Sequence, residues 1–162
     1  MGSKIQPDFY YKSIFDVELE KLKIEGIEGI ICDIDNTIVP WSKREIVKEV
    51  VNWFDEIESY GFKICLVSNG TGSRVTYFSE KLGVPAVGRA VKPAKRAFYR
   101  AMDKLGMDPE QIAVIGDQLF TDVFGGNRMG FTTVLVNPMS DRELFTTRLL
   151  RKLEKLFFER ED

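Results

Sequence analysis

Four aspartates in two short motifs could bind a metal ion. DIDNT carries Asp33 and Asp35, GDQLFTD carries Asp117 and Asp122, and each motif ends an apolar run. Asp33 and Asp35 would point the same way if the strand continued, and two carboxylates so close repel each other unless a cation lies between them. Carboxylates without a nitrogen ligand suit a hard cation. We therefore expect Mg²⁺ at this site.

The lack of histidine excludes several other kinds of site. None of the 162 residues is His, so a Ser-His-Asp triad, a Cys-His pair and a zinc site with His ligands are ruled out. Acid–base chemistry then falls to Asp, Glu, Lys, Tyr or Cys. The formal net charge of −2 gives no reason to expect nucleic acid as a partner.

On its own, DIDNT could also be a surface loop or a calcium-binding loop. An EF-hand loop that begins at Asp33 requires glycine at its sixth position and glutamate at its twelfth. This chain has Ile38 and Arg44 at those places. The sequence therefore disfavours a calcium loop, while the surface loop stays open at this point.

Further along the chain, Ser68 and Lys92 could stabilise a phosphoryl group. Ser68 in LVSNGTG offers a hydroxyl, and the glycines at 70 and 72 let backbone N–H groups approach phosphoryl oxygens. Lys92 offers an ammonium group, with Lys95 as a rival one helical turn away. Taken singly, Ser68 is more typical of a turn cap and Lys92 of a solvated surface. Only the full set of residues favours phosphoryl chemistry.

The elements that must position these residues alternate from residue 27 onward. Strands are predicted at 27–34, 63–68, 85–88, 112–116 and 132–137. Helices are predicted between them: one that a Ser42–Glu45 capping box begins and Gly61 ends, one near 73–82, one with Pro93 in its first turn, and one near 120–128. Apolar strands alternating with helices indicate a parallel sheet covered on both faces, a three-layer α/β/α Rossmann-like fold.

The carboxyl ends of these strands should form the site. Open parallel sheets bind ligands beyond the carboxyl ends of their strands. Asp33 and Asp35 end the first predicted strand, Ser68 and Asn69 end the second, and Asp117 follows a later one. We expect these separated residues to converge on one rim.

At this point the motifs resemble a known superfamily. DIDNT, LVSNG, VKP and GDQLFTD, in this order, resemble the four motifs of the haloacid dehalogenase-like (HAD) phosphohydrolases. The resemblance implies that Asp33 is the nucleophile and Asp35 the general acid–base. It also implies that Ser68 binds the phosphoryl oxygens and that Lys92 neutralises charge around Asp33.

The same resemblance implies the metal ligands and the substrate contacts. Mg²⁺ would be held by Asp33, Asp117 and the backbone carbonyl of Asp35, and Asp122 would orient a metal-bound water. Three further residues are expected to contact the substrate: Thr37, Asn69 and Gly70.

The resemblance narrows to one family of small phosphatases. PDFYYKSIFDV, DIDNTIVPW and IGDQLFTDVFGGNRMG resemble the YqeG family, whose relatives include enzymes acting on phosphatidylglycerophosphate. The likeness runs from about residue 5 to about residue 158. It implies a hydrolase that takes a phosphomonoester, with a membrane lipid as the leading substrate. Soluble phosphometabolites, nucleotides and phosphoproteins are the alternatives.

The spacing of the motifs leaves no room for a cap domain. Only 30 residues lie between Thr37 and Ser68, and one core helix uses most of them. The segment from Ser68 to Lys92 has room for one helix and a short strand. The chain therefore resembles the capless subfamily III of the superfamily. An open site suits a large or surface-presented substrate, although it also admits small phosphates.

The organisation expected is a single domain over 1–162, with a core at 27–138 and an N-terminal arm at 1–26. The aromatic side chains of the arm either cover an edge of the core or touch a bilayer. An amphipathic, basic helix near 141–160 either docks on the sheet or lies on an anionic membrane. Without a signal peptide or an apolar spanning segment, we expect a cytoplasmic protein, with peripheral contact to the inner face of the membrane as an option.

Three rival functions are weaker. A phospho-sensing receiver domain also uses Asp, Mg²⁺, Ser/Thr and Lys, but its acidic pair comes first and its Lys last, whereas here Lys92 precedes Asp117. A non-catalytic scaffold does not fit a chain with every expected catalytic side chain. A mutase usually needs a cap that excludes water. Hydrolysis is therefore the predicted reaction.

Overall fold

A single parallel sheet forms the centre of the protein. The computed structural model describes residues 5–139 and residue 155. Six strands pair in parallel in the order β1-β6-β5-β2-β3-β4. Their bounds are Phe9–Tyr11 (β1), Gly29–Cys32 (β2), Lys63–Val67 (β3), Ala86–Val87 (β4), Ile112–Gly116 (β5) and Thr132–Val136 (β6).

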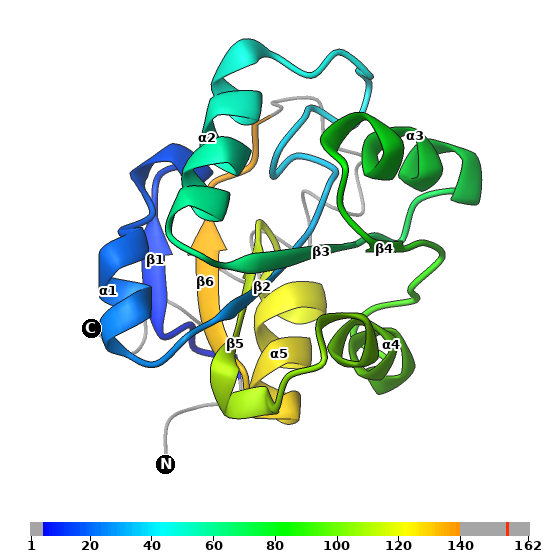
Figure 1. The fold of residues 1–162 in the computed structure, drawn as a ribbon. Coiled ribbons are helices and arrows are strands. Elements are labelled where there is room, and N and C mark those ends of the chain that lie inside the picture. The colour runs from blue at the N-terminus through cyan, green and yellow to red at the C-terminus, as the bar shows by residue number, and fades with distance from the viewer. Residues whose placement is uncertain (1–4, 140–154, 156–162) are drawn as a thin grey trace.

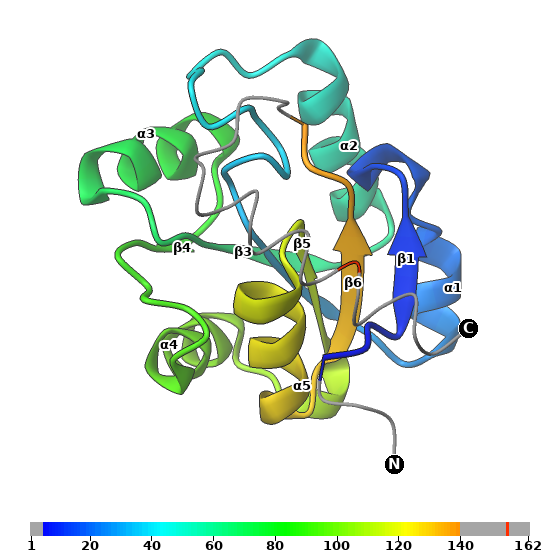
Figure 2. The ribbon, with the colours of Figure 1, turned by 180° about the vertical axis from the view of Figure 1, so that it is seen from behind.

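Helices cover both faces of this sheet. Figures 1 and 2 show α2 and α3 on one side of it and α4 and α5 on the other. The helix bounds are Leu19–Ile24 (α1), Lys48–Ser59 (α2), Gly72–Leu82 (α3), Lys95–Leu105 (α4) and Phe124–Met129 (α5), with short turns at Ile14–Asp16 (η1), Pro109–Gln111 (η2) and Leu119–Val123 (η3, a π-helical turn). The predicted three-layer α/β/α fold is confirmed.

Side chains that alternate along each strand supply two separate cores. In β2, Ile30 and Cys32 pack with residues of α1, α2 and α3, whereas Ile31 packs with residues of α4 and α5. Because successive side chains of a strand point to opposite faces, a strand covered on both faces must be apolar throughout. The continuous apolar runs of the sequence are explained by this two-sided burial.

The topology creates a switch point at the end of β2. From β2 the chain crosses by α2 to β3 on one side, while β5 pairs with the other side of β2. The backbone N–H of Asp33 donates to the carbonyl of Ile115, 3.0 Å away, so the β2–β5 pairing extends to the start of DIDNT. Open α/β sheets bind ligands in the crevice at such a point.

Within residues 5–139, no cap domain interrupts the core. The segment between β2 and β3 contains α2 as its one named helix, and the segment between β3 and β4 contains α3. The rim above the strand ends is therefore built from loops of the core itself.

Two predicted helix starts are wrong. α2 begins at Lys48 after an extended Val47, so Ser42 and Glu45 form no capping box. From Asn36 onward the chain instead folds as turns, in which Asn36 N–H donates to the Val39 carbonyl and Lys43 N–H donates to the Pro40 carbonyl. α4 begins at Lys95 rather than at Pro93, because the chain stays non-helical while it carries Lys92 inward.

The predicted N-terminal arm is part of the sheet. β1 lies at the sheet edge beside β6, and Thr133 N–H donates to the Asp8 carboxylate at 2.8 Å. Ile14 and Leu22 are fully buried in the core between the sheet and the helices α1, α2 and α3. The aromatic residues Phe9 and Tyr11 pack against that core, so they cover its edge.

No helix among the described residues is long and apolar enough to cross a membrane. The amphipathic helix predicted near 141–160 lies, except for residue 155, outside the described residues.

We predict that Leu22→Ala lowers the free energy of unfolding by about 2–5 kcal/mol, because it leaves a cavity in a filled core. Ile24→Ala is the matched control on the same helix, since Ile24 is 79% exposed, and should change stability by less than about 0.5 kcal/mol. Chemical denaturation of both variants measures the difference. Equal, small effects would contradict a structural role for the N-terminal segment.

Candidate active site

Three buried aspartates meet at the switch point. Asp33 follows β2, Asp117 follows β5, and Asp122 lies in the π-helical turn η3. Each offers a carboxylate oxygen within 4.8 Å of the others, and all three side chains belong to buried residues. The predicted convergence of the two acidic motifs is present in the structure.

Lys92 is the cation that faces this cluster. Its Nζ lies 2.9 Å from Asp33 Oδ1 and 2.7 Å from Asp122 Oδ1. Burial alone would lower the pKa of Lys92, but attraction to Asp122 and Asp33 outweighs it and holds the pKa above its ordinary value. Of the two candidate lysines, Lys92 therefore occupies the site, whereas Lys95 is the half-buried first residue of α4.

The charges of the cluster do not balance. Burial raises the pKa of Asp122 to about 6, attraction to Lys92 opposes the rise, and the charge of Asp33 adds to it. The cluster thus contains three carboxylates and the Lys92 ammonium, which forms ion pairs with Asp33 and Asp122. Thr37 Oγ1 lies 3.4 Å from Asp33 Oδ2 and 3.3 Å from Asp117 Oδ1, which adds another oxygen to the same site. An all-oxygen donor set with excess negative charge fits a divalent cation.

A glycine allows Asp122 to reach the cluster. A Cβ added at Gly116, the last residue of β5, would overlap the Asp122 carboxylate. The same carboxylate accepts a hydrogen bond from the backbone N–H of Gln118 at 3.3 Å. The spacing in GDQLFTD therefore turns the chain back so that Asp122 lies behind the end of β5.

Ser68 and Gly70 form the opposite wall. Ser68 is buried at the end of β3, and its Oγ accepts a hydrogen bond from Gly70 N–H at 3.0 Å, which leaves the hydroxyl hydrogen as a donor. A Cβ added at Gly70 would lie 3.1 Å from Ser68 Oγ and 3.3 Å from Asp35 Oδ2. Both atoms therefore border the space that glycine leaves open.

Asn69 supports the lysine loop. Its Oδ1 accepts a hydrogen bond from the backbone N–H of Lys92 at 2.7 Å. Arg89 and Val91, just before Lys92, have φ values of 49° and 53°, a left-handed conformation that is unusual for a β-branched residue such as valine. The loop is held in this shape by backbone bonds to the Ser68–Gly70 segment, in which Arg89 N–H donates to the Gly70 carbonyl.

Asp35 does not lie beside Asp33 in the way a continued strand would place it. β2 ends at Cys32, and Asp35 instead turns toward α3, where Arg74 Nε donates to Asp35 Oδ1 at 2.8 Å. The predicted site did not include Arg74. Its signal in the sequence is a basic residue in the first turn of α3, a turn that contains no acidic residue.

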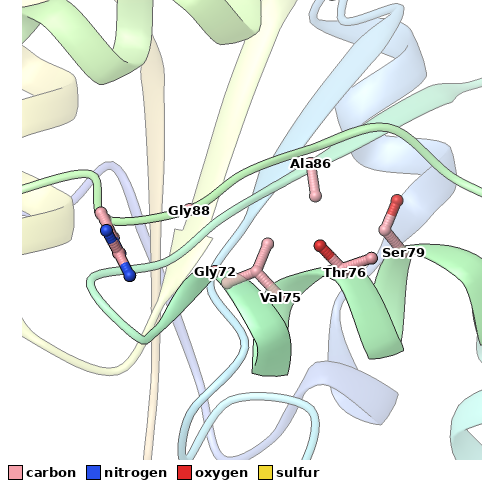
Figure 3. A pocket seen from close by; sticks show the side chains of 7 residues that line it. Gly72, Val75, Thr76, Ser79, Ala86 and Gly88 are labelled. Carbon is pink, nitrogen blue, oxygen red and sulfur yellow. The ribbon is translucent and has the colours of Figure 1, made fainter.

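A separate cavity lies between α3 and β4. Figure 3 shows it between the helix and the strand, and its volume is about 350 Å³. It is lined by Gly72, Val75, Thr76, Ser79, Ala86, Gly88 and Arg89. None of these residues belongs to the carboxylate cluster, and Arg89 lies in the loop that carries Lys92.

Several known proteins are similar to this chain in sequence or in fold. Residues 2–140 match the family model of the mitochondrial PGP phosphatases. The chain is 44% identical over 149 residues to the "probable phosphatase YqeG" of Bacillus subtilis, covering 92% of this chain and 87% of that protein. It is 26% identical to the chloroplastic and mitochondrial phosphatidylglycerophosphate phosphatase 1 of Arabidopsis thaliana, covering 96% of this chain but only 48% of the plant protein.

A solved structure shares the fold. The HAD phosphatase of Thermococcus onnurineus superposes with a TM-score of 0.53 at 23% identity, covering 62% of this chain and 51% of that one. The match of the family model over most of the sequence, together with the 44% identity, decides the assignment. The chain belongs to the YqeG/PGP phosphatase family and has the fold of the HAD phosphatases.

Proposed function

We propose that this phosphatase uses Mg²⁺ and a phosphoryl group carried on Asp33 to hydrolyse phosphatidylglycerophosphate. The observation that carries the proposal is the position of Asp33, whose carboxylate contacts Lys92 at a site shared with Asp117 and Asp122. This arrangement offers a nucleophilic oxygen, a fixed positive charge and a site for a divalent cation in one place.

Asp33, Asp117 and the backbone carbonyl of Asp35 would hold Mg²⁺, with Asp122 beside them. When bound, the ion would offset the negative charge that the carboxylates and the phosphoryl oxygens bring together. Lys92 keeps one oxygen of Asp33 in place, so the direction of attack is fixed before the substrate arrives.

In the first step, an Asp33 oxygen attacks phosphorus and the bond from phosphorus to the leaving oxygen breaks. Asp35 gives its proton to that oxygen, so the product leaves as an alcohol. The Ser68 hydroxyl and the N–H groups after it donate to phosphoryl oxygens, and Lys92 neutralises charge that develops there.

In the second step, water attacks the phosphorus of the acyl phosphate. Asp35, now a carboxylate, takes the proton from the water, and the bond between phosphorus and the Asp33 oxygen breaks. Inorganic phosphate leaves and Asp33 is restored. Thr37 lies within reach of Asp33 and Asp117, so it stays a proposed contact for substrate or bound water.

The lipid substrate is supported by two observations. The relative from Arabidopsis thaliana is a phosphatidylglycerophosphate phosphatase by name, and the family that matches residues 2–140 is that of the mitochondrial PGP phosphatases. The described residues also lack a cap over the rim, so a headgroup presented by a membrane can approach. We also propose that the protein is cytoplasmic and that it contacts an anionic membrane peripherally. The proposal includes no nucleic-acid partner.

We predict rapid phosphate release from phosphatidylglycerophosphate in mixed micelles with Mg²⁺, well above release from soluble phosphate esters. Asp33→Asn should abolish release because an amide cannot form the acyl phosphate, whereas Asp103→Asn, on the exposed side of α4, should leave it unchanged. Release from soluble esters alone would discard the lipid and keep the chemistry. Equal release by wild type and Asp33→Asn would refute the mechanism.

Removal of the metal should stop turnover, and Asp117→Asn should raise the Mg²⁺ concentration for half-maximal activity by about tenfold or more, since it deletes a charged ligand. Thermal unfolding provides an independent readout, because a bound ion stabilises the folded state. Mg²⁺ should raise the melting temperature of the wild type and raise it less in the variant. Activity that survives chelation, or an equal thermal shift in both proteins, would count against the assigned ligands.

A further inference from the structure

Arg74 joins the residue proposed as acid–base to the first helix of the rim. Its Nε donates to Asp35 Oδ1 at 2.8 Å, and the two side chains are 15% and 28% exposed. Its Nη2 donates to the Pro40 carbonyl at 3.3 Å, and its guanidinium carbon lies 5.0 Å from the centre of the buried Phe78 ring. Arg74 is therefore held at three points and cannot move without releasing Asp35.

The position of this arginine does not favour the helix that carries it. Arg74 lies in the first turn of α3, where the partial positive charge of the helix end repels a cation. The contact with Asp35 offsets this repulsion. A purely local role in the helix would be better served by an acidic residue, and the first turn of α3 contains none.

The contact also decides which oxygen of Asp35 faces the reaction. Oδ1 is occupied by Arg74 Nε, so Oδ2 is the oxygen that can face the substrate. Oδ2 and Ser68 Oγ lie on either side of Gly70, because a Cβ added there would be 3.3 Å from Oδ2 and 3.1 Å from Ser68 Oγ. Oδ2 is thus directed toward Ser68, where a phosphoryl group bound by Ser68 would meet its leaving oxygen.

We propose that Arg74 is the positioning residue for Asp35: by engaging Oδ1 it fixes Oδ2 toward the leaving group and then toward the attacking water. The inference rests on the proposed function, because it requires phosphoryl transfer to Asp33. Arg74 forms no bond to the reacting atoms in this role. It acts through the orientation of Asp35 alone.

The dependence on the leaving group tests this role. The p-nitrophenolate ion leaves without a proton, whereas an alkoxide needs one. kcat/KM covers the steps up to departure of the leaving group, so it should be measured for p-nitrophenyl phosphate and for phosphatidylglycerophosphate in mixed micelles, with glycerol 3-phosphate as a soluble alkyl ester. Arg74→Gln should lower kcat/KM for the alkyl esters by about 100-fold and for p-nitrophenyl phosphate by less than about tenfold.

Control variants separate positioning from other effects. Arg100→Gln, the same change at an exposed position of α4, should alter neither value. In an Asp35→Asn background, Arg74→Gln should leave the ratio of kcat/KM for the alkyl esters to kcat/KM for p-nitrophenyl phosphate unchanged, because the group that Arg74 positions is gone. Arg74→Lys keeps the charge but loses the planar fork, so its ratio should fall between those of wild type and Arg74→Gln. Arg74→Lys replaces Arg74→Gln in the comparison if thermal unfolding shows that Arg74→Gln is unfolded.

The outcomes are distinguishable. An equal loss for both leaving groups would overturn the positioning role and leave the proposed function standing. A rise in KM at constant kcat, for the alkyl esters and p-nitrophenyl phosphate alike, would also overturn the positioning role, because Arg74 would then be a residue that binds the substrate. A wild type that hydrolyses none of the three esters would refute the proposed function, and the role of Arg74 with it.

Discussion

Repulsion between buried carboxylates is the constraint on which the site depends. Asp33, Asp117 and Asp122 bring their oxygens within 4.8 Å of one another in the interior, and Lys92 offsets only part of their charge. Buried like charges persist where fixed cations or a bound metal compensate them, and otherwise a carboxyl group takes up a proton. The same excess of charge that opposes folding would favour a bound divalent ion, so the stability of the fold would depend on what compensates these carboxylates.

The strand pairing and the packing of the fold hold these charged side chains close together. β2 is the central strand from which Asp33 emerges, and it is paired on both sides, by β5 and by β3. Asp117 follows the neighbouring β5, and the Gly116 backbone leaves the space that Asp122 fills. The loop that carries Lys92 is tied to the Ser68–Gly70 segment by backbone hydrogen bonds. Two cores, one on each face of the sheet, keep these strand ends in register.

The sequence predicted most of the sheet and the position of the acidic motifs, because two-sided burial leaves continuous apolar runs and polar residues end them. It could not predict what depends on distant contacts. β1 has only three residues and is recognisable only through its pairing with β6. Ser42 and Glu45 have the local pattern of a capping box, but the turns after DIDNT override it. Arg74 meets Asp35 across 38 intervening positions, and no local pattern reveals that pair.

Trapping the acyl phosphate tests most directly whether Asp33 carries the phosphoryl group. Asp35→Asn should slow hydrolysis of the acyl phosphate, so rapid acid quenching of this variant with p-nitrophenyl phosphate and Mg²⁺, followed by peptide mass spectrometry, should reveal one added phosphoryl group on the peptide that contains Asp33. The modification should disappear when Asp33→Asn is added. Turnover without any modified peptide, or a phosphoryl group on another residue, would contradict the account.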